Sequence, residues 1–83
     1  MRVRVLYFAA LRELAGRAEE SLELPAEVRT VDALRPLLEA RVPALAGRLG
    51  SVRFARNEAF AEGGEALEDD DVIALIPPVA GGA

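Results

Sequence analysis

The 83-residue sequence contains neither cysteine nor histidine. Without cysteine there can be no disulfide bond, thiolate nucleophile or zinc–thiolate site. Without histidine the chain lacks the commonest general base and the commonest ligand of transition metals. Hydroxyl side chains other than tyrosine are limited to Ser21, Thr30 and Ser51, and no imidazole is present to activate them. This inventory argues against an autonomous enzyme and predicts no metal site.

Positive charge is scarce: ten arginines and no lysine face fourteen acidic residues, for a net charge of −4. A negative chain without a basic cluster does not suit a phosphate backbone, so we expect no nucleic-acid partner. Seven acids lie within residues 58–71 without a single base, namely Glu58, Glu62, Glu65, Glu68, Asp69, Asp70 and Asp71. They are typical of a solvated loop face, and the alternative is an electrostatic label that steers a basic partner. A calcium loop is disfavoured, because the alternating ligand spacing is missing.

Long apolar runs are missing as well. The longest uncharged stretch, residues 72–83, is too short to span a bilayer and is interrupted by Pro77 and Pro78. Met1 is followed by alternating charges instead of the apolar core of a signal peptide. We therefore expect a cytoplasmic protein with no membrane partner. A content of 52% hydrophobic and 29% charged residues predicts one small globular domain.

The spacing of apolar residues predicts a mixture of strands and helices. A short helix is expected over residues 9–16, with Gly16 as its C-cap. The main helix is expected over residues 30–42 with Thr30 as N-cap, and Pro36 should kink or shorten it unless the helix begins later. Strands are expected where charged and apolar residues alternate or where apolar residues run between turn signals, at 2–8, 20–24, 52–56, 59–61 and 72–76.

This order of elements predicts an α+β fold in which a mixed sheet packs on one main helix. The strand at 72–76 is apolar throughout, which is typical of a central strand buried on both faces, and we expect it beside the strand at 2–8. The domain is expected to span residues 1–78. A flexible tail, residues 79–83, is expected to follow it.

Residues 77–83, Pro-Pro-Val-Ala-Gly-Gly-Ala, combine a stiff start with a stretch that has almost no side chains. The two prolines fix φ at the exit of the last strand, and Gly81 and Gly82 carry no Cβ atoms. A frayed terminus is one interpretation, because most domains place their disorder there. The other is a tail that enters the narrow active site of another protein.

Several segments, in this order along nearly the whole chain, are similar to those of one known family. They are residues 7–16 (Tyr-Phe-Ala-Ala-Leu-Arg-Glu-Leu-Ala-Gly), 30–35 (Thr-Val-Asp-Ala-Leu-Arg), Asn57 at a hairpin turn, 67–72 (Leu-Glu-Asp-Asp-Asp-Val) and 77–82 (Pro-Pro-Val-Ala-Gly-Gly). Together they resemble the small subunit of molybdopterin synthase. The Pro-Pro-Val-x-Gly-Gly ending is the most specific of these segments.

The resemblance implies a ubiquitin-like β-grasp fold and the role of a sulfur carrier that binds no cofactor itself. In this family a partner enzyme uses ATP to adenylate the C-terminal glycine, here Gly82 preceded by Gly81, and a sulfur source converts it to a thiocarboxylate. The large synthase subunit, on which the catalytic residues are expected, accepts the tail and transfers the sulfur to form the dithiolene of molybdopterin. Ala83 departs from the family, which ends on the second glycine. Either Ala83 is removed before activation, which we expect, or the partners tolerate a terminal alanine, or the chain is inactive as a carrier.

The resemblance also implies contacts with the large subunit by Phe8, Phe60, Ile76, Pro77, Pro78 and Val79. Alternation along the first strand favours an outward-facing Phe8, because Val3 and Val5 share the opposite face. Alternation leaves Ile76 open, because Leu75 could face outward instead. For Phe8, Phe60 and Ile76, burial in the core is the alternative to exposure.

Other functions remain compatible with the same residues. The carrier could deliver sulfur to thiazole synthesis or to tRNA, or could be joined to protein lysines as a ubiquitin-like modifier. A β-grasp interaction domain that carries nothing is a further alternative, which Ala83 keeps open. The chain itself has no lysine, so it cannot form lysine-linked polymers.

Overall fold

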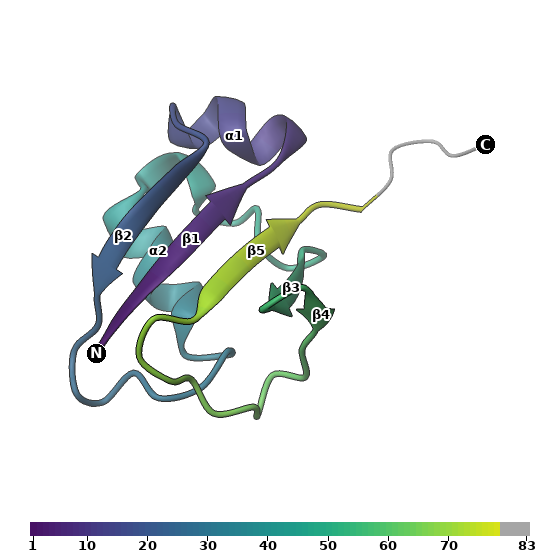
Figure 1. Cartoon of the computed structure of the whole chain (residues 1–83). Helices are drawn as coiled ribbons and strands as arrows, with labels where there is room; N and C mark the ends of the chain where they lie inside the picture. Colours follow the sequence, from purple (N-terminus) through teal and green to yellow (C-terminus); the bar gives the residue numbers. More distant parts are fainter. Residues whose placement is uncertain (79–83) are drawn as a thin grey trace.

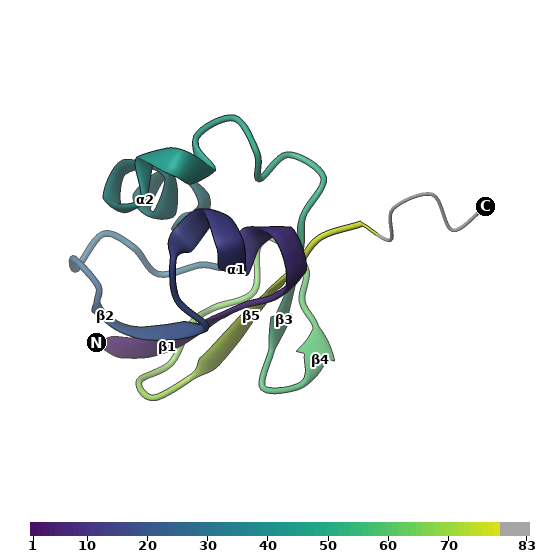
Figure 2. The same cartoon turned by 90° about the horizontal axis from the view of Figure 1, so that it is seen from above.

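Two α-helices lie on one face of a five-stranded sheet in the computed structural model, which describes residues 1–78 (Figure 1 and Figure 2). The elements in chain order are β1 (Arg2–Tyr7), α1 (Ala9–Ala15), β2 (Glu19–Glu23), α2 (Leu34–Arg41), the 3₁₀ turn η1 (Pro43–Leu45), β3 (Arg53–Arg56), β4 (Ala59–Phe60) and β5 (Val72–Ile76). None of the helices within residues 1–78 is long and apolar enough to cross a lipid bilayer. The predicted tail, residues 79–83, lies outside the described residues and stays a prediction.

The sheet has the strand order β2-β1-β5-β3-β4. β1 and β5 pair in parallel, and the other pairs are antiparallel, so the sheet is mixed. The first and last strands therefore lie side by side in the sheet, as the sequence predicts. The predicted α+β fold class is confirmed, with each strand within one or two residues of its expected bounds.

The hydrophobic core fills the space between the sheet and the helices. Alternation along β1 buries Val3, Val5 and Tyr7. Leu34 and Leu38 of α2 are fully buried in the same cluster, one helical turn apart. Burial of this one sheet face fixes which side of each strand points outward.

The helices differ in how closely they follow the sequence prediction. α1 ends as predicted: Gly16 adopts the left-handed conformation (φ 76°), and its N–H donates to the Arg12 carbonyl. The predicted start of α2 at Thr30 is wrong, because the helix begins at Leu34 after Ala33 as N-cap. Thr30 forms an antiparallel bridge with Ala66, and its Oγ1 accepts the Ala33 N–H at 3.4 Å in the turn that precedes the helix. Pro36 therefore lies in the first turn, where a missing N–H costs no helical hydrogen bond.

β5 is central as predicted, but the prediction that both its faces are buried is wrong. Ile73 and Leu75 are fully buried, whereas Val72, Ala74 and Ile76 on the other face are only half-buried. The physical reason is that the helices lie on one side only, so no helix among residues 1–78 covers the outer face of the sheet (Figure 2). The apolar residues of that outer face require a different explanation.

Arg35 of α2 holds the segment that leads into β3. Its guanidinium donates to the carbonyl oxygens of Leu49 and Val52, the second at 3.2 Å. The same guanidinium lies over the ring of Phe54, 4.6 Å from its centroid. One side chain therefore ties the helix layer to the beginning of β3.

Candidate functional site

The outer face of the sheet carries an apolar groove of about 520 Å³. Its floor is formed by the half-buried side of β5 and by Ala55 of β3, and Ala55 is itself buried. We call it the outer groove. Its lining residues are Leu6, Phe8, Ala55, Asn57, Glu58, Phe60, Val72, Ala74 and Ile76. The exposed apolar side chains gathered here make this face of the sheet the candidate interaction site.

The three apolar side chains proposed from the sequence meet in this groove. Phe8 is 46% exposed and Phe60 is 56% exposed, so burial in the core is excluded for both. Ile76 is half-buried and faces the groove, because its neighbour Leu75 is fully buried on the other side. The outward orientation of Phe8 agrees with the alternation of the first strand, and the position of Leu75 decides the orientation that alternation left open for Ile76. Their contact with a partner stays a prediction.

The β3–β4 hairpin positions Phe60. Asn57 and Glu58 form its two-residue turn with positive φ angles of 51° and 71°, which suit the right-handed twist of the flanking strands. Phe60 then pairs with Ala55 across the ladder. The hairpin thus places an aromatic ring at the rim of the groove.

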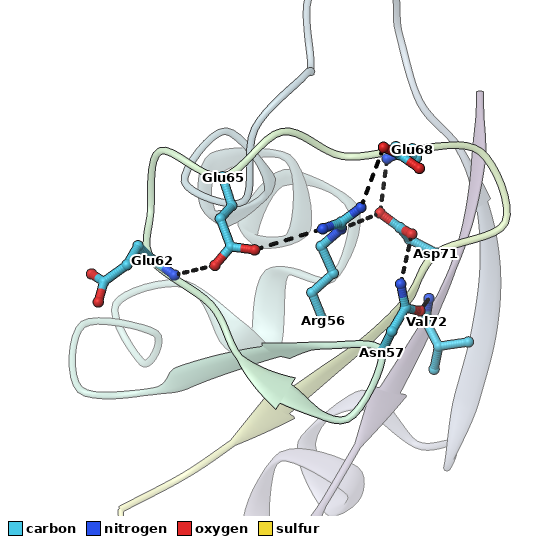
Figure 3. Close-up of polar contacts among 7 residues, drawn as sticks. All are labelled: Arg56, Asn57, Glu62, Glu65, Glu68, Asp71 and Val72. Carbon is cyan, nitrogen blue, oxygen red and sulfur yellow. Dashed lines mark hydrogen bonds and ion pairs between the residues drawn. The ribbon is translucent and has the colours of Figure 1, made fainter.

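A buried acid locks this hairpin to the start of β5 (Figure 3). Asp71 is 5% exposed and accepts hydrogen bonds from Arg56 Nε at 2.6 Å, the Glu68 N–H at 2.8 Å and Asn57 Nδ2 at 2.9 Å. Asn57 in turn accepts from the Val72 N–H at 2.9 Å. The turn of the hairpin and the first residue of β5 are therefore held by one carboxylate and one amide.

The electrostatics of this cluster favour the charged forms. Burial alone would raise the pKa of Asp71, but the hydrogen bonds from Arg56, the Glu68 backbone and Asn57 outweigh it and hold that pKa below its usual range. The hydrogen bond to Asp71 raises the pKa of Arg56 against its partial desolvation. Arg56 also pairs with Glu65 at 3.6 Å and Glu68 at 3.7 Å.

The acidic segment 58–71 is therefore not uniformly the solvated face that its composition predicts. Asp71 is a buried structural acid, whereas Glu58, Asp69 and Asp70 are exposed. The sequence carried one signal of this, the lone base Arg56 placed directly before the acidic segment. Within residues 1–78, no group of three or more acids is arranged to hold a metal ion.

The end of β5 connects the groove to the tail. Because β1 and β5 run parallel, Phe8 and Ile76 lie where both strands end, at the same end of the sheet. Pro77 is half-buried and Pro78 is exposed at the exit of the strand. The residues that follow, including Val79, Gly81 and Gly82, lie outside the described residues. The chain thus brings its proposed docking surface to the point where the glycine-rich segment begins.

Known proteins match the sequence of this chain over nearly its full length. The family model described as "ThiS family" matches residues 5–82. This chain belongs to the ThiS family. Proteins named molybdopterin synthase sulfur carrier subunit are 40% identical in Chlamydomonas reinhardtii (99% of this chain, 100% of that protein) and 38% identical in Escherichia coli (96% and 99%). The resemblance drawn from the sequence is confirmed.

Solved structures of other proteins share the fold. SAMP1 from Haloferax volcanii superposes with a TM-score of 0.85 at 30% identity, covering 99% of this chain and 100% of that one. One chain of the complex of subunits 1 and 2 of the molybdopterin-converting factor from Helicobacter pylori superposes with a TM-score of 0.71 at 28% identity. The match covers 99% of this chain and 100% of that one. The ubiquitin-like β-grasp fold that the resemblance implies is confirmed.

Proposed function

We propose that this ThiS-family chain is the sulfur carrier subunit of a molybdopterin synthase. One observation carries the proposal: the outer groove reaches the C-terminal end of β5, where Pro77 and Pro78 lead into the Gly81–Gly82 segment. A carrier needs a surface that docks and a terminus that reacts, and in this chain Ile76 of the groove precedes Gly82 by only six residues. The curated relatives that bear the carrier name match it over nearly their full length.

The chemistry that we propose takes place at the carboxyl group of Gly82. That carboxylate attacks the α-phosphorus of ATP on an adenylating enzyme, and pyrophosphate leaves. A sulfide-level sulfur nucleophile then attacks the acyl carbon, and AMP leaves with one former carboxylate oxygen, which gives a thiocarboxylate. The chain holds no thiol or imidazole to catalyse either step, so its partners supply the catalysis. We assign this ATP-dependent chemistry to the cytoplasm.

The large subunit of the synthase is the partner proposed for the outer groove. Phe8 and Phe60 present exposed aromatic surface, and aromatic residues are enriched among the side chains that dominate binding energy. The Helicobacter pylori neighbour was solved as a complex of subunits 1 and 2 of its converting factor. Docking through this groove directs Pro77, Pro78 and Val79 toward the partner's active site.

Ala83 must be removed for this chemistry to use Gly82. A deletion of Ala83 should be thiocarboxylated at least as well as the wild type. Gly81→Val and Gly82→Val should block the reaction, because a branched Cβ does not fit a channel shaped for glycine. Each protein is incubated with the adenylating enzyme, ATP and a sulfur source, and intact mass reports the exchange of one oxygen for sulfur.

The outcome separates the steps. A wild type that is thiocarboxylated on Ala83, beside a deletion variant that never reacts, would contradict the removal. If neither protein reacts with any adenylating enzyme of the same cell, the carrier function is wrong. Normal unfolding curves for both valine variants would confirm that they lose activity and not the fold.

A second function is favoured by one specific observation. Two structures named as small archaeal modifier protein 1, or SAMP1, superpose with TM-scores of 0.85 and 0.83. Attachment of Gly82 to lysines of other proteins uses the same acyl-adenylate. Immunoblotting for higher-mass conjugates that vanish in Gly82→Val tests this modifier role alongside the thiocarboxylate assay.

A further inference from the structure

Arg53 lies at the rim of the outer groove beside two of its lining side chains. β3 alternates, so Arg53 is exposed on the outer face while Phe54 is buried. Arg53 pairs in register with Ile76, and its guanidinium carbon lies 3.7 Å from the centroid of the Phe60 ring. Stacking at this distance holds the cation in place by cation–π attraction.

The charge of Arg53 is unpaired within the part of the chain that the structure describes. Arg56, on the same strand, has Asp71, Glu65 and Glu68 as partners at 2.6–3.7 Å. No carboxylate of residues 1–78 forms an ion pair with Arg53. The two arginines of β3 therefore differ: one closes an internal network, and the other faces outward.

The stack leaves the hydrogen-bonding edge of Arg53 open. The five N–H donors of a guanidinium lie in its plane, so a ring under its face does not occupy them. A forked edge of this kind matches a carboxylate in a two-bond pair. Any partner that covers Phe60 and Ile76 also removes water from Arg53. Because a cation that loses water without gaining an acceptor is unfavourable, the partner has to supply one.

The two ends of the outer groove carry different charges, which determines where on the partner the acidic group must lie. The polar lining residues at the other end, Asn57 and Glu58, lie at the hairpin turn beside Val72, where β5 begins. Arg53 lies beside Ile76, where β5 ends. The groove is thus acidic at one end and cationic at the end from which the tail leaves. A complementary partner carries its acidic group at the tail end, which fixes its orientation.

We infer that Arg53 is a specificity-determining residue that recognises a carboxylate side chain of the large synthase subunit at the tail end of the outer groove. The inference rests on the proposed function for the identity of the partner. Phe60 acts in it as the platform for the cation as well as an apolar contact.

The test measures binding of the full-length chain to the large subunit at several salt concentrations. Arg53→Met keeps the length and apolar stem but removes the charge, and Arg53→Lys keeps the charge without the planar fork. Arg41→Met is the matched control, because Arg41 is exposed at the end of α2 on the opposite side of the sheet. Biolayer interferometry gives the association rate, the dissociation rate and Kd for each.

Arg53→Met should weaken binding about tenfold at low ionic strength, the loss expected for one charge-assisted pair. It should also flatten the salt dependence of the association rate, whereas Arg53→Lys keeps that dependence. Arg41→Met should behave like the wild type. Equal affinity of Arg53→Met and wild type at every salt concentration would overturn the inference while leaving the proposed function intact. A wild type that does not bind the large subunit at all would instead remove the proposed function, and the inference with it.

Discussion

Replacing Asp71 by asparagine tests whether the buried carboxylate holds the domain together. The change preserves volume, but three donors at 2.6–2.9 Å now face one acceptor oxygen and an NH₂ group. A hydrogen bond to a charged group contributes about 1.5–3 kcal/mol, and at least one such bond is lost. We expect Asp71→Asn to lower the free energy of unfolding by about 2–4 kcal/mol. For a domain of this size, that is a fall in Tm of about 10–20 °C.

The pH dependence gives the prediction a second, independent readout. The pKa of Asp71 is lowered in the folded state, so its stabilisation is fully present above the unfolded value of about 4. It is lost as the pH falls through the lower folded value, because the protonated acid no longer pairs with Arg56. The difference in unfolding free energy between wild type and Asp71→Asn should therefore be constant from neutral pH to about pH 5 and shrink below about pH 4.

The assay is urea unfolding followed by circular dichroism, at neutral pH and at steps down into the acid range. Asp70→Asn is the matched control, since it makes the same chemical change one residue earlier, at an exposed site with φ 68°. Asparagine tolerates that left-handed conformation, so the control should stay within about 0.5 kcal/mol of wild type. Equal stability of the two variants would refute the reasoning. A wild-type advantage over Asp71→Asn that persists unchanged at strongly acidic pH would refute the electrostatic part alone.

Two further predictions concern the two faces of the sheet. Phe60→Glu should leave Tm nearly unchanged, since the ring is 56% exposed. It should weaken binding to the large subunit by about 30-fold, because the new charge loses water in an apolar groove. Affinity is measured by calorimetry, and Ala40→Glu, at an exposed position on α2, is the control. Tyr7→Phe should cost about 1 kcal/mol near neutral pH, since the buried hydroxyl donates to Glu20 at 2.7 Å. Burial is the larger cause and the hydrogen bond to Glu20 the smaller cause that raise the pKa of Tyr7 in the folded state. The stability that the hydroxyl contributes is therefore lost only as the pH rises above about 10 and through the raised folded value. Equal stability of Tyr7→Phe and wild type in urea would contradict this prediction.

Local rules account for the parts of the fold that the sequence predicted. Three predicted features depend only on residues close in the sequence: the Gly16 cap, the Asn57–Glu58 turn and the inward face of β1. The exposure of Phe8 followed from the same alternation. These features hold because the local preference and the tertiary context agree.

Long-range pairing explains what the sequence did not predict. Arg56 and Asp71 are fifteen residues apart, and only the return of the chain to β5 makes them neighbours. Thr30 is a residue type that favours N-caps and its Oγ1 accepts the Ala33 N–H, yet it pairs with Ala66 and the helix begins only at Leu34. In each case a contact between distant segments overrides or adds to the local signal.

The central position of β5 has a mechanical consequence when a partner holds the chain by its C-terminal end. A pull on Pro78 along the strand axis loads the ladders to β1 and β3 together, because β5 is paired on both sides over its length. Force applied in this direction shears many hydrogen bonds at once, whereas an edge strand pulled away from a sheet opens them one after another. A partner that grips the terminus can therefore draw the carrier into position, or release it, without unravelling the domain.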